Sequence, residues 1–133
     1  MKINSVNPVN QYQQRSQNFG MAVVLKHPEI PYNITKRLKA EDISKFSNAL
    51  AKLTKAQESN KATNIVFAEN GAYPLINITR MPDCTTLRTI SCADKAYVSM
   101  PDEDSFIKIM EDAGQLADSY SKLTETANRI NVV

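Results

Sequence analysis

The stretch PDEDSFIKIMEDAGQLADSYSKLTETANRI, from Pro101 to Ile130, carries the longest regular pattern in the chain. Apolar residues recur in it at alternating spacings of three and four, which places them on one stripe of an α-helix. No proline interrupts the pattern, and the acidic residues at its start favour the positive end of a helix dipole. We therefore predict a C-terminal helix about 40 Å long, at 1.5 Å per residue. The stripe consists of Phe106, Ile109, Ala113, Leu116, Tyr120, Leu123, Ala127 and Ile130.

This stripe has two interpretations: a coiled-coil seam through which the protein self-associates, or a face that packs on the protein's own sheet. The flanking positions lack the alternating Glu/Lys pairs that specify coiled-coil partners. Met110 and Ala117 instead broaden the apolar face, which is typical of a helix on a core. We expect the first half of the helix to cover the sheet and the second half to project toward a partner. The predicted partner-binding residues are Tyr120, Leu123, Ala127 and Ile130.

Gly114 stands inside the predicted helix, where glycine costs about 1 kcal/mol relative to alanine. A glycine at such a position indicates either a bend or a close contact with another element.

The remaining chain predicts one compact domain behind a polar tail. Eight Asn or Gln residues fall between positions 4 and 18, so little apolar surface is available to offset the entropy of ordering. We therefore expect residues 1–18 to be disordered and residues 19–133 to form a single domain. In that domain we predict a strand at Phe19–Leu25, a loop at Lys26–Ile34 and an amphipathic helix at about Lys36–Ser59.

A run of short strands follows the first helix. Asn70-Gly71 predicts a tight hairpin turn, because both central positions of such a turn favour positive φ. With the first strand, the pattern predicts an α+β fold, an antiparallel sheet of about five strands with both helices on one face. The threonine-rich side of the strand at Thr85–Ser91 would lie on the face of the sheet that the helices leave uncovered. The four later strands are expected at Asn64–Ala68, Tyr73–Met81, Thr85–Ser91 and Lys95–Met100.

No constellation of residues in the sequence indicates an active site. There is no Gly-rich phosphate loop, and one histidine, His27, with two cysteines eight residues apart does not match a zinc spacing. Cys84 and Cys92 at the ends of one strand would be about 26 Å apart at ~3.3 Å per residue, too far for a disulfide. We expect a non-enzymatic protein without metal or cofactor and with reduced thiols.

Neither a membrane span nor the apolar core of a signal peptide is evident in the sequence. We predict a cytoplasmic protein without membrane contact, although export by a route that reads the polar tail stays open.

We expect a protein-binding or adaptor module that self-associates through the C-terminal helix, and two alternatives stay open. One follows from the charge, which is unevenly distributed along the chain. Residues 1–61 hold ten Lys/Arg against four Asp/Glu, whereas residues 62–133 hold six against ten. The first alternative is therefore a nucleic-acid-binding protein, since phosphate contacts need only such charges. The second is a small-ligand carrier with a cavity between the sheet and the C-terminal helix. The predicted nucleic-acid contacts are Lys36, Arg37, Lys39, Lys45 and Lys52.

Overall fold

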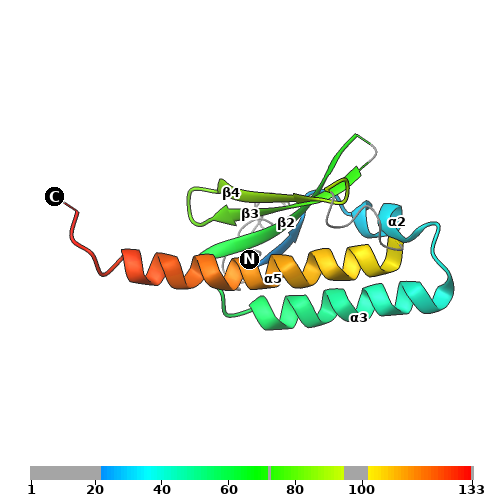
Figure 1. Ribbon diagram of the computed structural model, residues 1–133, viewed down its shortest axis with the longest axis horizontal. Coiled ribbons are helices and arrows are strands. Elements are labelled where there is room, and N and C mark those ends of the chain that lie inside the picture. The colour runs from blue at the N-terminus through cyan, green and yellow to red at the C-terminus, as the bar shows by residue number, and fades with distance from the viewer. Residues whose placement is uncertain (1–21, 72, 95–101, 133) are drawn as a thin grey trace, which may run out of the picture.

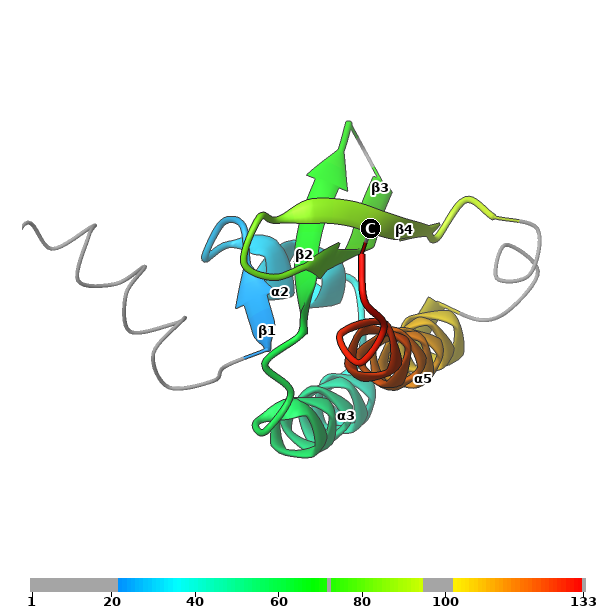
Figure 2. The same cartoon turned by 90° about the vertical axis from the view of Figure 1, so that its left-hand side faces the viewer.

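The computed structural model describes residues 22–71, 73–94 and 102–132. These residues form two layers, a sheet and a pair of helices that lie side by side on one of its faces (Figures 1 and 2). The arrangement confirms an α+β fold with a long C-terminal helix. In chain order the elements are β1 (Val23–Leu25), α2 (Ile30–Thr35), α3 (Ala40–Gln57), β2 (Thr63–Asn70), β3 (Tyr73–Arg80), β4 (Thr85–Ser91) and α5 (Asp102–Ala127).

The sheet has the order β1-β2-β3-β4. β2, β3 and β4 form an antiparallel meander, as predicted, and Gly71 in the β2–β3 turn has a positive φ of 63°. Asn70, the other predicted central residue of that turn, instead ends β2 and pairs with Tyr73. Thr89 of β4 faces Asn77 of β3 on the face away from the helices, and its hydroxyl donates to Asn77 Oδ1 over 2.7 Å.

The prediction of about five antiparallel strands was only partly right. Four strands are described, and β1 runs parallel to β2, with Val24 opposite Val66. The physical reason is the connection: β1 and β2 are separated by two helices, and such a crossover carries the chain back to the end of the sheet at which β1 began, so that β2 runs in the same direction. Residue patterns predict strands but not their direction. The predicted strand at 95–100 and the predicted tail at 1–18 lie outside the described residues.

The segment after β1 also differs from its prediction as a loop. Ile30 begins α2, with Pro31 in its first turn, where a missing N–H costs no helical hydrogen bond. Ile30 and Ile34 are buried in the core, so burial of two isoleucines stabilises a helix that the prolines appeared to forbid. α3 in turn begins at Ala40 rather than Lys36 and ends at Gln57.

The hydrophobic core lies between the sheet and the α3–α5 layer. Ile65 of β2 and Ile78 of β3 stand opposite each other and are both fully buried. Ala113 of α5 is also fully buried, so its small side chain lets the helix approach the sheet closely. At one end of the layer the rings of Phe46 and Phe106 pack edge to face, with centroids 6.3 Å apart.

α3 and α5 run in the same direction and touch closely at Gly114 (Figure 1). A Cβ added to Gly114 would lie 3.1 Å from Leu53 Cδ1. Of the two meanings that the sequence leaves open for this glycine, the close contact is therefore the one observed.

A buried polar network ties α5 to the connection between α3 and β2. Gln57 is 1% exposed, and its amide donates to Asp118 Oδ1 over 2.8 Å. Asn60 donates to Gln57 Oε1 over 2.9 Å and to the hydroxyl of fully buried Thr63 over 2.8 Å. The Thr63 hydroxyl in turn donates to the carbonyl of Ala117 over 3.4 Å. These bonds hold α5 in place at residues 117–118 and so determine where the helix leaves the core.

Candidate interaction site at the C-terminal end of the long helix

The C-terminal part of α5 extends past the sheet and past the end of α3 (Figure 1). The large apolar side chains there are exposed: Leu123 to 61%, Ile130 to 65% and Val132 to 97%. We call residues 121–132 the overhang. Within the described residues, the overhang is the segment in which the apolar stripe of α5 continues beyond the core and becomes exposed.

The structure divides the four predicted partner-binding residues. Tyr120 is half-buried and packs against the core. Leu123 and Ala127 are exposed on the last turns of α5. Ile130 lies just beyond the helix, but its N–H still donates to the carbonyl of Ala127 over 3.1 Å, so the turn continues to this residue. The overhang therefore brings together Leu123, Ala127 and Ile130, whereas Tyr120 belongs to the edge of the core.

A mismatch of periods explains why the stripe leaves the core. The apolar residues repeat every 3.5 residues on average, whereas a straight α-helix has 3.6 residues per turn, and the difference is about 20° per heptad. Between Ile109, which is buried, and Ile130 the stripe therefore rotates by about 60° around the helix. This rotation adds to the extension of α5 past the sheet (Figure 1), and together they expose the second half of the stripe.

A groove lies beside α5 on the β4 side, before the overhang. Its volume is about 450 Å³, with both polar and apolar residues along it. Leu116 lines this groove and precedes Leu123 on the stripe by seven residues, so the groove and the overhang are continuous along α5. β4 is the last strand on this side of the described sheet. The lining residues are Arg88, Thr89, Ile90, Asp94, Asp112, Gln115, Leu116 and Ser119.

Sequence reasoning missed the groove and Val132. The groove combines residues 88–94 with residues 112–119, which only the fold brings together. Leu116 was the one member with a signal, because it belongs to the apolar stripe. Val132 lies beyond the last position of that stripe.

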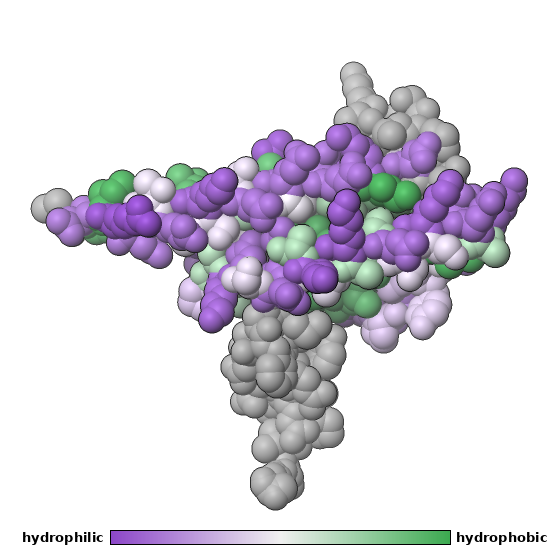
Figure 3. Space-filling view, turned by 90° about the horizontal axis from the view of Figure 1, so that it is seen from below, coloured by the Kyte–Doolittle hydropathy of each residue, from purple (hydrophilic) through white to green (hydrophobic). Residues whose placement is uncertain are grey.

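All five residues of the predicted nucleic-acid surface are exposed. Lys45 Nζ, however, lies 3.7 Å from Asp42 Oδ1, and Glu41 is exposed in the same turn of α3. Acidic groups thus interrupt the basic residues, and a view from the helix side shows hydrophilic residues over most of the surface (Figure 3). The remaining predicted contacts are Lys36, Arg37 and Lys39, in the connection between α2 and α3, and Lys52 on α3.

Arg80, at the end of β3, is also engaged by an acidic neighbour. Its guanidinium donates two hydrogen bonds to Asp83, and the Thr85 hydroxyl donates another over 2.9 Å. These bonds, the Arg80 pair first, hold the pKa of the Asp83 carboxyl well below its usual range.

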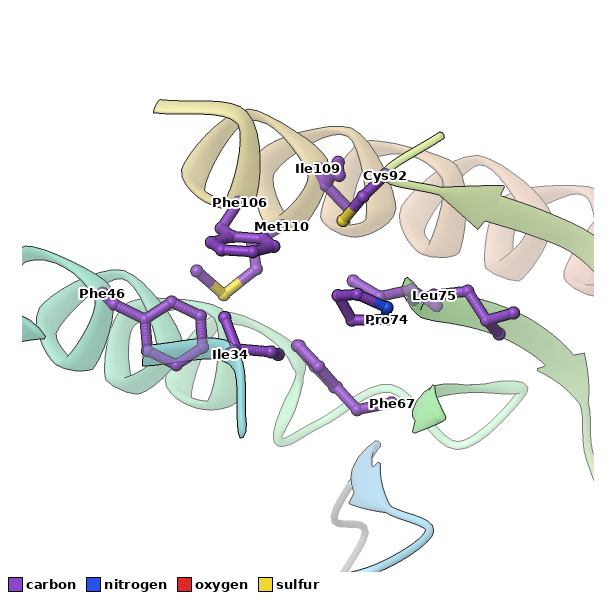
Figure 4. Close-up of a pocket in the computed structure, with 10 residues that line it drawn as sticks. Ile34, Phe46, Phe67, Pro74, Leu75, Cys92, Phe106, Ile109 and Met110 are labelled. Carbon is purple, nitrogen blue, oxygen red and sulfur yellow. The ribbon is translucent and has the colours of Figure 1, made fainter. Parts of the chain in front are cut away.

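The space between the sheet and the helices is filled by side chains. Figure 4 shows Ile34, Phe46, Phe67, Phe106 and Met110 pointing toward one another. The cavity that remains among them has a volume of about 10 Å³. That is room for about one water molecule, whereas small-ligand sites typically span ~300–1,000 Å³.

Cys84 and Cys92 do not form a disulfide. In the described parts of the chain, no group of three or more His, Cys, Asp or Glu residues is placed to hold a metal ion. None of the described helices is both long enough and apolar enough to span a membrane. Comparison with known proteins found no matching family model, no similar curated protein and no similar solved structure.

Proposed function

We propose that this protein is a non-enzymatic protein-binding module that self-associates through the C-terminal end of α5. The observation that carries the proposal is the exposure of Leu123 and Ile130 on the same stripe whose earlier members are buried. Single exposed apolar residues are ordinary on a protein surface. A stripe that continues past the core instead places several apolar side chains on one face of the helix, where a partner can contact them together. Burying one such side chain contributes about 1.5–3 kcal/mol.

The chemistry around the stripe favours a second copy as the partner. Three residues that border the stripe near Leu123, namely Ser119, Thr124 and Thr126, carry no charge, and Lys122 is a charged neighbour. An identical helix therefore meets repulsion between like charges only from Lys122. Closed symmetric dimers are also the commonest form of self-association.

Of the two alternatives, nucleic-acid binding has weaker support, since Asp42 and Glu41 stand among the basic residues. A ligand carrier has less support still, because the cavity among the core side chains holds about one water and the larger groove between β4 and α5 is open to solvent. The cytoplasmic location expected from the sequence stays a prediction.

Light scattering after size-exclusion chromatography tests the proposal with two variants. Leu123→Lys places a charge on the stripe, and Glu125→Lys introduces the same side chain at an exposed position off the stripe. Lysine has a helix propensity close to that of leucine and glutamate, so neither change disturbs α5 itself. We expect a dimer for the wild type and for Glu125→Lys, and a monomer for Leu123→Lys. If Leu123→Lys and Glu125→Lys had the same mass by light scattering, the proposal would be contradicted.

A further inference from the structure

The apolar stripe alone is too small for a stable dimer. From Leu116 to Ile130 it spans fourteen residues, or about 21 Å, and a helix with side chains is about 11 Å wide. The projected area is therefore about 230 Å² on each partner, against roughly 800 Å² in a standard interface. A dimer built on this stripe must bury additional surface.

The spacing of the stripe indicates where that surface lies. Leu116 and Ile130 are each seven residues from Leu123. If two copies of α5 pair antiparallel about a two-fold axis at Leu123, Ile130 of one copy lies beside Leu116 of the other. Leu116 lines the groove between α5 and β4. The two-fold arrangement thus brings the end of each chain to the groove of its partner.

We propose that residues 128–132 of a second copy occupy this groove. The inference rests on the proposed function and names the contact that completes it. The groove, about 450 Å³, is large enough for a few side chains. Val132, almost fully exposed within its own chain, would lie there with Ile130. Because the arrangement is symmetric, residues 128–132 of each copy occupy the groove of the other. Both grooves are then filled, so the dimer is closed and binds no further copies.

The lining of the groove suits such a segment. Ile90 and Leu116 provide apolar contacts for the side chains, and Arg88, Gln115 and Ser119 provide polar groups. α5 ends at Ala127, so the backbone groups of residues 131 and 132 lack helical hydrogen bonds. Buried backbone groups require partners, and the polar side chains of the groove are placed to supply them.

A cysteine pair distinguishes this contact from other forms of association. Leu116 and Ile130 are each seven residues from Leu123 on the stripe, and they face each other across the proposed two-fold axis. Within one chain they are about 21 Å apart along the helix, beyond the ~7 Å limit between Cα atoms for a disulfide. In a Cys84→Ser, Cys92→Ala background, Leu116→Cys with Ile130→Cys can therefore cross-link only between copies.

Mild oxidation followed by a non-reducing gel gives the readout, with light scattering on the same sample before oxidation. The matched control is Lys52→Cys with Ile130→Cys, since Lys52 is exposed on α3. We expect a covalent dimer for the groove pair and none for the control. Equal cross-linking of both pairs, or a dimer by light scattering without the groove cross-link, would overturn the groove contact and leave the proposed function standing. A monomer would overturn both.

Val132→Asp provides a second measurement that leaves the core untouched. If the side chain is buried in the partner's groove, the dimer dissociation constant should rise at least about tenfold. A dissociation constant equal to that of the wild type would contradict the groove contact.

Discussion

Replacing Gly114 with alanine tests the close contact between α3 and α5. Two effects oppose each other. Alanine favours a helix interior over glycine by about 1 kcal/mol. The new methyl group, however, would lie 3.1 Å from Leu53 Cδ1, closer than ordinary van der Waals contact. Leu53 is itself buried, so its side chain must move within a packed core, and such overpacking costs about 1–3 kcal/mol. We expect Gly114→Ala to leave the free energy of unfolding unchanged or to lower it by about 2 kcal/mol.

A double-mutant cycle separates these two effects. Leu53→Ala alone should destabilise the protein by about 2–5 kcal/mol, because it removes a buried leucine. In that background the clashing atom is absent, so Gly114→Ala should stabilise the protein by about 1 kcal/mol or slightly more. The coupling free energy between the two positions should therefore reach about 1–3 kcal/mol.

Urea unfolding followed by circular dichroism measures all four proteins of this cycle. The comparison requires equal slopes of free energy against urea, so that a shifted midpoint reports stability. If Gly114→Ala stabilised the wild type and the Leu53→Ala variant by the same amount, the two helices would not be in contact at this point, and the account of the glycine would be wrong.

The remaining predictions concern the polar network and the β3–β4 turn. Gln57→Ala should lower the free energy of unfolding by about 1–3 kcal/mol in urea, because it removes a buried side chain together with its hydrogen bonds to Asp118 and Asn60. Gln115→Ala, at an exposed position, should change the free energy of unfolding by less than about 0.5 kcal/mol. The pairing with Arg80 lowers the pKa of Asp83 in the folded state, so it stabilises the fold at any pH above about 3.9, the carboxyl pKa in the unfolded chain. This contribution is lost as the pH falls below that value toward the lower pKa of the folded state. NMR titration should find Asp83 still ionised at about pH 3, and Arg80→Ala should return its pKa toward 3.9; an unchanged titration would contradict the pairing.

The long helix was predictable from sequence because its signal is local. Apolar spacing alone located α5 and separated a half that packs from a half that projects. The same spacing did not reveal that Tyr120 belongs to the core, because the boundary depends on the network that Gln57 forms with Asp118. Nor did it reveal how far α5 extends past the sheet and past the end of α3 (Figure 1), which depends on the lengths of those elements.

Features that depend on distant pairs were not predictable in this way. The parallel pairing of β1 with β2 follows from a crossover of two helices, and the short α2 follows from burial of Ile30 and Ile34. The groove needs Arg88 and Leu116 side by side, although they stand 28 residues apart in sequence. Local patterns contain no information about such pairs until the fold is known.

The mass of the wild-type protein in solution tests the central claim most directly. Light scattering after size-exclusion chromatography, on reduced protein at low and high salt, should give twice the chain mass of 14.9 kDa. The mass should be the same at both salt concentrations, because the residues at the centre of the proposed interface, Leu123, Ala127 and Ile130, are apolar and salt screens only charge. A mass of 14.9 kDa at every concentration and in both buffers would contradict self-association through α5.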